Sequence, residues 1–225
     1  MAPPSSETRT RALVFANGDL NAGSAVQTAL SHAPDAIIIA ADGGARLALA
    51  CDLVPDVVVG DMDSLAPDEQ ADLVARGAVL EKHPAAKDEN DLELALLAAV
   101  AHGAAWIRVI GALGDRLDQV LANITLLALG DLAGRDVRLV AGEQTIWLVG
   151  PGEHDLHGAP GDTISLIPLA GDASGVRTDE LKYPLRGETL AFGPARGVSN
   201  VMRAESARVT LAAGSLVVVH TPGRA

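Results

Sequence analysis

Residues 36–44 read AIIIAADGG, an unbroken apolar run that ends on an aspartate and two glycines. A run that is apolar at every position is typical of a strand buried on both faces of a parallel sheet. Further largely apolar runs occur before residue 150, and helix-like stretches separate them, which predicts an N-terminal α/β domain with a mostly parallel sheet. We expect strands at residues 12–16, 36–41, 57–60, 106–110 and 137–141, and helices at residues 22–31, 45–51, 67–76, 89–102 and 117–129.

The sequence changes character after residue 150. Short alternating segments, such as residues 163–167, 208–211 and 216–220, lie between glycines and prolines. Alternation of this kind is typical of antiparallel strands, so we expect a smaller C-terminal antiparallel β domain. The predicted domains are residues 12–142 and 143–222. Residues 145–149 fit either the last strand of the first domain or a bridge between the two domains.

The composition indicates an acidic globular protein. Of the 225 residues, 48 % are hydrophobic and 20 % are charged, and the formal net charge is −12. This charge disfavours binding to nucleic acid or to an anionic membrane, because no basic patch interrupts it. Cys51 is the single cysteine, which excludes an internal disulfide and favours a reducing compartment. Residues 1–11 contain no apolar stretch of the signal-peptide type, so we expect a cytoplasmic protein.

Aspartates follow two of the expected strands directly. Open α/β sheets bind ligands at the carboxyl ends of their strands, so these positions are candidates for a site. Asp42 precedes Gly43 and Gly44, which permit positive φ and let a ligand approach the backbone, although Asp42 fits a helix cap equally well. Asp61 and Asp63 stand two residues apart in an expected loop. Two carboxylates placed behind a buried strand repel each other unless a cation lies between them, so we favour a metal site over a solvated turn.

A third acidic group opens the helix expected at residues 89–102. Asp88 and Asp91 are three residues apart, which would place both carboxylates on one helical face. Lys87 beside them adds a cation that can hold phosphates while the acids hold a metal. The structural alternative makes Asp88 the N-cap and Asp91 a favourable charge at the positive end of the helix.

A glycine-containing turn precedes the helix expected at residues 117–129. Such turns bind phosphate through free backbone N–H groups at a helix N-terminus, and Gly114 lies in this one. Arg116 adds a planar fork for the same anion. Asp118 fits either a site residue or a first-turn acid, and we favour phosphate binding over simple capping.

Taken in order, these four motifs resemble the motif series of the thiamine pyrophosphokinase family. The segments GVRT (residues 175–178), LKYPL (181–185) and GVSN (197–200) resemble its thiamine-binding domain, so the resemblance spans residues 12–220. It implies an ATP-binding α/β domain, a thiamine-binding β-sandwich-like domain, and a homodimer with thiamine at the interface. It also implies a Mg²⁺-dependent reaction in which the thiamine hydroxyl attacks the β-phosphorus of ATP, giving thiamine diphosphate and AMP.

The resemblance also assigns roles to individual residues. The implied catalytic residues are Asp63, Asp88, Arg116 and Asp118. The implied ATP or phosphate ligands are Asp42, Gly43, Gly44, Lys87, Gly114 and Arg116. The implied metal ligands are Asp61, Asp63, Asp88 and Asp91, and the implied thiamine ligands are Tyr183, Ser199 and Asn200.

Three positions depart from the family pattern. Asn90 stands where the family often has Thr, Gln119 where it often has His, and Glu180 where it usually has Gly. Asn90 and Gln119 still hydrogen-bond, whereas Glu180 brings a charge near the expected thiamine pocket and bears on substrate identity.

Other functions fit parts of the same pattern. The same chemistry could act on another small alcohol, and a non-catalytic nucleotide or thiamine sensor would keep the pockets without turnover. Asp61-Met62-Asp63 also fits the Asp-x-Asp motif of nucleotide-sugar transferases, which leaves the other motifs unexplained. Neither Gly-x-x-x-x-Gly-Lys-Ser/Thr nor Gly-x-Gly-x-x-Gly occurs, which disfavours a P-loop enzyme and an ordinary dinucleotide-binding protein.

Overall fold

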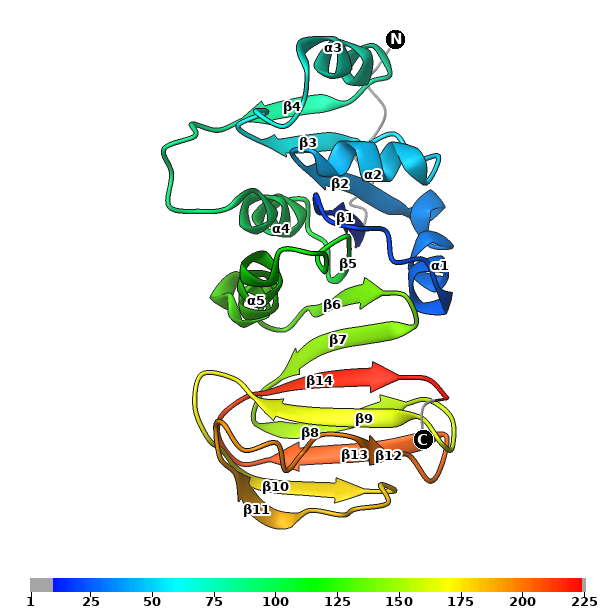
Figure 1. The fold of residues 1–225 in the computed structure, drawn as a ribbon, viewed down its shortest axis with the longest axis vertical. Helices are drawn as coiled ribbons and strands as arrows, with labels where there is room; N and C mark the ends of the chain where they lie inside the picture. Colours follow the sequence, from blue (N-terminus) through cyan, green and yellow to red (C-terminus); the bar gives the residue numbers. More distant parts are fainter. Residues whose placement is uncertain (1–9, 224–225) are drawn as a thin grey trace. The chain divides into compact units, whose positions relative to one another are not determined.

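The computed structural model describes residues 10–223, which form two compact units divided between Gly142 and Glu143 (Figure 1). The first unit contains a parallel sheet in the order β6-β5-β1-β2-β3-β4. Its strands are β1 (Arg11–Phe15), β2 (Ala36–Ala41), β3 (Val57–Gly60), β4 (Val79–Lys82), β5 (Trp106–Ile110) and β6 (Asp136–Ala141). Its α-helices are α1 (Ser24–Leu30), α2 (Gly44–Ala50), α3 (Pro67–Ala75), α4 (Asp91–Ala101) and α5 (Leu117–Thr125).

The strand order reverses at β1. The chain adds β2, β3 and β4 on one side of β1 and then returns to add β5 and β6 on the other side. A reversal of this kind opens a crevice at the carboxyl ends of the strands, here between β1 and β5, where α/β proteins bind ligands. Helix α4 packs on β1, β2 and β3, and α2 packs on β1 and β2. The core between these layers includes the fully buried side chains of Leu13 and Phe15.

The predicted α/β class is confirmed, with strands at residues 36–41, 57–60 and 106–110 as expected. Strand β4 was not predicted. It is an edge strand that pairs only with β3, and its first residue, Val79, is 57 % exposed. An edge strand with open faces needs no apolar run, so the pattern that identified the other strands is absent from it.

The helices begin and end at slightly different residues than expected. Helix α4 begins at Asp91, and Asn90 is its N-cap because Asn90 Oδ1 accepts a hydrogen bond from the Glu93 N–H at 2.8 Å. The expectation that Asp88 caps this helix was therefore wrong. Asp88 precedes the helix, so Asp88 and Asp91 do not share a helical face. Helix α5 ends at Thr125 and continues as a 3₁₀ turn, Leu126–Ala128.

The second unit consists of two antiparallel sheets, which confirms the expected change of architecture. One sheet has the order β12-β9-β14-β7 and the other the order β11-β10-β13-β8. The strands of the first are β7 (Gln144–Val149), β9 (Thr163–Pro168), β12 (Asn200–Val201) and β14 (Leu216–Thr221). Those of the second are β8 (Gly152–His157), β10 (Ala173–Asp179), β11 (Arg186–Leu190) and β13 (Ser206–Leu211).

One buried cluster takes side chains from both of these sheets, among them Leu166 of β9 and Val209 of β13. The two sheets therefore share a single apolar core, as in a β-sandwich. Strand β7 pairs with β14 along its length, which assigns residues 145–149 to the second unit. Within residues 10–223, no helix has both the length and the apolar character needed to span a bilayer.

Candidate active site

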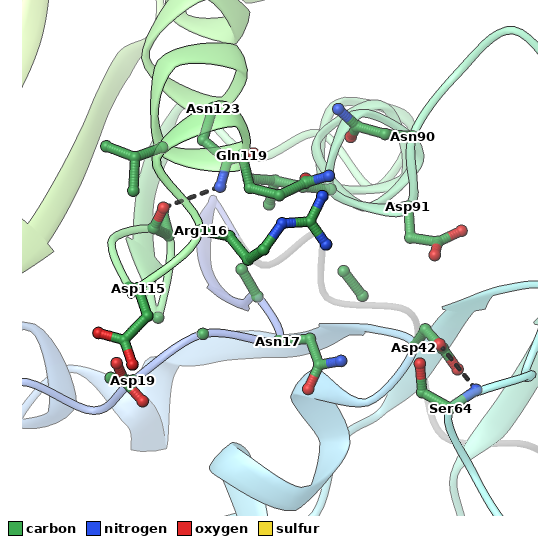
Figure 2. A pocket seen from close by; sticks show the side chains of 18 of the residues that line it. Asn17, Asp19, Asp42, Ser64, Asn90, Asp91, Asp115, Arg116, Gln119 and Asn123 are labelled. Atoms are coloured by element: carbon green, nitrogen blue, oxygen red, sulfur yellow. Dashed lines mark hydrogen bonds between the residues drawn. The ribbon is translucent and has the colours of Figure 1, made fainter.

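A cleft of about 610 Å³ opens at the carboxyl ends of the parallel strands in the first unit (Figure 2). The loops that follow β1, β2 and β5 line it, together with the beginnings of α4 and α5. This is the position that the reversal of strand order at β1 favours for a ligand.

Three aspartates form an acidic trio, and two of them, Asp42 and Asp91, line the cleft. Asp42 follows β2, Asp61 follows β3 and Asp91 begins α4, and each offers a carboxylate oxygen within 4.8 Å of the others. Asp42 is 3 % exposed, and its Oδ2 accepts a hydrogen bond from the Ser64 N–H at 3.2 Å. Its Oδ1 is buried and has no hydrogen-bond partner among the described residues. A buried acceptor without a partner is costly, so the chemistry of this trio fits a hard divalent cation.

Two of the predicted metal ligands lie outside this acidic trio. The Asp63 carboxylate is exposed and accepts the Ser64 hydroxyl at 3.2 Å, while the Asp63 N–H donates to Asp61 Oδ1 at 3.0 Å. Asp88 is also exposed. Asp42, predicted as a phosphate ligand, takes their place in the group. The two-residue spacing of Asp61 and Asp63 suggested convergence on one ion, whereas the chain brings together carboxylates from three separate segments.

The backbone of Asp42 is unusual. Its φ is 42°, in the left-handed region that non-glycine residues seldom adopt. Gly43 has an ordinary φ of −56° and Gly44 begins α2, so the expectation that these glycines supply the positive φ was wrong. They permit close approach instead. A Cβ atom on Gly44 would lie 2.1 Å from the Phe15 carbonyl oxygen, and one on Gly43 would lie 2.6 Å from the Asn17 side chain.

Lys87 lines the cleft and pairs with the acidic trio. Its Nζ lies 2.9 Å from Asp91 Oδ1, and its side chain is 11 % exposed. The hydrogen bond to Asp91 raises the pKa of Lys87, and the charges of Asp61 and Asp42 add to the increase. Lys87 therefore keeps its positive charge beside the three carboxylates.

Gly114 and Arg116 also line the cleft, as the sequence predicted for a phosphate site. Asp118 does not line it. Instead, Asp118 pairs with Arg116, whose Nε lies 2.9 Å from Asp118 Oδ1. Hydrogen bonds from Arg116 lower the pKa of Asp118 to about 2. Both side chains of this ion pair are exposed.

The cleft contains polar residues that the sequence reasoning missed. Figure 2 shows Asp19 and Asp115 together at the end of the cleft opposite Asp42 and Asp91. Asn123 of α5 is 7 % exposed and donates from Nδ2 to the Ala112 carbonyl oxygen at 2.8 Å, which ties the helix to the turn after β5. Asp19 could have been found from the sequence. Like Asp42, it closely follows a predicted strand, which is where open α/β sheets bind ligands.

The predicted thiamine ligands lie in the second unit. Asn200 is 7 % exposed and clamps the backbone of Tyr183: its Oδ1 accepts the Tyr183 N–H at 2.9 Å and its Nδ2 donates to the Tyr183 carbonyl oxygen at 2.7 Å. The Tyr183 ring is 60 % exposed. Ser199 has a φ of 59°, and its N–H donates to Ser165 Oγ at 3.0 Å. The fold thus joins Tyr183 and Asn200, and it commits the Asn200 amide to the backbone.

The fold and the cleft define a two-unit α/β protein whose site combines carboxylates, Lys87 and Arg116, a combination that suits a phosphate-bearing ligand. Comparisons with known proteins agree. The family model of the thiamin pyrophosphokinase catalytic domain matches residues 28–137, and that of the thiamin pyrophosphokinase vitamin B1 binding domain matches residues 153–216. Together they match more than half of the chain. The chain belongs to the thiamine pyrophosphokinase family.

Individual relatives show the same likeness. Thiamine pyrophosphokinase of Bacillus subtilis (strain 168) is 29 % identical over 184 residues, which cover 81 % of this chain and 86 % of that protein. The match to thiamine pyrophosphokinase 1 of Oryza sativa subsp. japonica, at 26 % identity, covers 69 % of this chain and 62 % of the rice protein. The crystal structure of the Bacillus subtilis thiamine pyrophosphokinase superposes with a TM-score of 0.83 at 25 % identity, covering 94 % of this chain and 99 % of that one.

Proposed function

We propose that this protein is a thiamine diphosphokinase that transfers a pyrophosphoryl group from ATP to the hydroxyl of thiamine, giving thiamine diphosphate and AMP. The acidic trio carries the proposal, because Asp42 presents a buried oxygen that has no hydrogen-bond partner among the described residues, next to two further carboxylates and Lys87. Phosphoryl-type transfer depends on positioning and on charge neutralisation, and this cleft holds the groups for both.

We assign Mg²⁺ binding to Asp42, Asp61 and Asp91. The bound ion would neutralise charge on the transferred phosphates. Asp63 and Asp88, which the sequence also nominated, lie outside the acidic trio, and a pair of variants described in the Discussion tests this distinction.

Lys87 and Arg116 are the cations of the cleft that we assign to the ATP phosphates, with the backbone around Gly114 as a further contact. Asp118 would hold the Arg116 fork in place, because their ion pair is already formed. In the reaction, a bond forms between the thiamine hydroxyl oxygen and the β-phosphorus. The bond from that phosphorus to the oxygen bridging it to the α-phosphorus breaks, AMP leaves with this oxygen, and the hydroxyl proton passes to a carboxylate.

We assign thiamine binding to the second unit, through Tyr183 and Ser199, with Asn200 holding the Tyr183 backbone. Two exposed apolar side chains on α5 support a homodimer. Leu117 is 68 % exposed and Leu121 is 57 % exposed, and they lie one helical turn apart. Such a stripe suits a second copy of the chain. The single cysteine and the use of ATP agree with a cytoplasmic location.

The experiment is AMP release from ATP, measured with and without thiamine and Mg²⁺, with Asp61→Asn as the inactive control. We expect AMP formation only when both are present, and loss of it in Asp61→Asn. If AMP formed with another small alcohol in preference to thiamine, the reaction type would stand and the assigned acceptor would change. ATP binding without AMP formation under any condition would overturn the proposal in favour of a nucleotide sensor.

A further inference from the structure

The loop that carries Asp61 is held from outside the cleft by two helices. Residues 61–65 follow β3, and three of their backbone carbonyls accept hydrogen bonds from the same side. Arg46 of α2 donates from Nη2 to the Ser64 carbonyl oxygen at 2.7 Å. Gln70 of α3 donates from Nε2 to the carbonyl oxygens of Leu65 at 2.8 Å and Met62 at 3.2 Å.

Each of these side chains is itself held in place. Arg46 makes a bidentate pair with Glu69, with Nε to Oε1 and Nη2 to Oε2 distances of 2.6 Å. Glu69 Oε2 also accepts the Ala66 N–H at 2.8 Å. Gln70 Oε1 accepts a hydrogen bond from Lys82 Nζ at 2.8 Å. A bidentate arginine pair restricts both partners to one geometry. The loop is therefore fastened to side chains that already hold one another in place, and we call this set the frame: Arg46, Glu69, Gln70 and Lys82.

The frame lies apart from the reacting groups. Arg46 and Glu69 line a separate hollow of about 180 Å³ between α2 and α3, whereas Asp42 and Asp91 line the 610 Å³ cleft. Arg46 and Gln70 are not among the cleft-lining residues. The uncharged Gln70 side chain can therefore act on a ligand in the cleft only through the loop, whereas the Arg46 charge also acts on Asp42.

The loop needs such support because its folded shape is strained. Met62 has a φ of 66° although its side chain is 4 % exposed and packed in the core. A non-glycine residue persists in this region only when its surroundings hold it there. Asp61 also lies among like charges, which repel each other in the absence of a cation. Both effects favour movement of Asp61 away from Asp42 and Asp91.

We propose that Arg46 and Gln70 are positioning residues for the cation site, which hold the 61–65 loop so that Asp61 meets Asp42 and Asp91 before an ion binds. The proposal rests on the proposed function in one respect, namely that the acidic trio binds a divalent cation. The frame replaces part of the ordering that the ion would otherwise have to impose, and such preorganisation increases affinity.

The test uses the full chain and Mn²⁺ alone as the probe, with free Mn²⁺ measured by electron paramagnetic resonance. The variants are Arg46→Met and Gln70→Met, which remove the hydrogen bonds and keep much of the side-chain volume. Arg76→Met is the matched control, because it breaks the exposed Arg76–Asp72 pair at 2.8 Å at the end of α3, and neither of these side chains hydrogen-bonds to residues 61–65. Circular dichroism melts report folding. Gln70→Met is the decisive variant because it changes no charge, whereas Arg46→Met also removes a positive charge that acts on Asp42.

We expect Mn²⁺ affinity to fall about 10- to 100-fold in Arg46→Met and Gln70→Met, as for other groups that support metal ligands, and to stay unchanged in Arg76→Met. AMP formation should need correspondingly more Mg²⁺ for half-saturation and recover most of its rate at saturating Mg²⁺. Unchanged Mn²⁺ affinity in both variants would overturn the positioning role alone. A wild-type protein that binds no Mn²⁺ would overturn the cation site, and with it the proposed function.

Discussion

The Nζ atom of Lys87 lies 2.9 Å from Oδ1 of Asp91, so one positive charge already lies beside the three carboxylates of the acidic trio. This lysine competes with a metal for the acidic trio and attracts the phosphates of a nucleotide. Removal of its charge should therefore have opposite effects on the two ligands.

We expect Lys87→Met to bind Mn²⁺ alone more tightly and ATP more weakly, each by at least about tenfold, since tenfold corresponds to about 1.4 kcal/mol and a unit charge about 4 Å away contributes up to about 4 kcal/mol near a protein surface. Calorimetric titrations with each ligand provide the measurement, and Arg76→Met, which removes an exposed cation outside the cleft, is the control. Changes of the same sign for both ligands would contradict this account of Lys87.

A comparison of Asp61→Asn with Asp63→Asn tests whether only the aspartate within the acidic trio binds the cation. Without a divalent cation, Asp61→Asn should raise the melting temperature, because it removes one of three mutually repelling charges. Added Mg²⁺ should stabilise the wild type, by about 2.7 kcal/mol at 100 times its Kd, and should stabilise Asp61→Asn much less. Asp63→Asn should behave like the wild type. Scanning fluorimetry with and without Mg²⁺ checks this. If both variants lost the stabilisation by Mg²⁺ equally, Asp63 would be a ligand of the ion as well.

Asn200 should act on thiamine through the Tyr183 backbone. Asn200→Ala leaves the Tyr183 N–H and carbonyl without their partner, which should lower the free energy of unfolding by about 1–3 kcal/mol. It should also raise the KM for thiamine more than it lowers kcat. Tyr183→Phe, which keeps the backbone clamp, should leave stability unchanged. Urea unfolding and steady-state kinetics measure the two effects, and a normal thiamine KM in Asn200→Ala would contradict the positioning role.

Glu180 has a φ of 57° and an exposed side chain. The left-handed conformation costs a residue with a Cβ roughly 1–2 kcal/mol relative to glycine, and the family usually has glycine at this position. We expect Glu180→Gly to increase the free energy of unfolding by about 1 kcal/mol, measured by urea titration. Asp179→Gly, one residue earlier in β10, should instead destabilise the protein, because glycine weakens a strand. Destabilisation by Glu180→Gly would show that the glutamate side chain has a stabilising contact of its own.

The Arg46–Glu69 pair predicts a specific pH dependence. Hydrogen bonds from Arg46, followed by the one from the Ala66 N–H, lower the pKa of Glu69 from 4.5 to about 2. A carboxyl group with a lowered pKa stabilises the folded state above its unfolded pKa, and this contribution is lost as the pH falls through the folded pKa. The difference in unfolding free energy between the wild type and Glu69→Gln should thus be constant above pH 5.5 and shrink as the pH falls from 4.5 towards 2. Urea titrations between pH 6 and pH 3 measure it, and a constant difference down to pH 3 would contradict the assignment.

Local sequence patterns determined most of the elements, though not β4, and the family of this protein. The run at residues 36–41 became β2 without any change of boundary, because a strand covered on both faces must be apolar at every position. The order and spacing of short motifs identified the thiamine pyrophosphokinase family, which the family models confirm. They also nominated Asp42, Lys87 and Arg116, all of which line the cleft.

Tertiary structure alone decided which carboxylates meet. Asp61 and Asp63 are neighbours in sequence, yet Asp61 groups with Asp42 and Asp91, because parallel strands bring residues from distant segments to one edge of the sheet. The same holds for the frame behind the loop, where Arg46 and Gln70 converge on backbone carbonyls that no sequence pattern marks. Sequence patterns report local conformation and burial, whereas a binding site depends on distances set by strand order and helix packing.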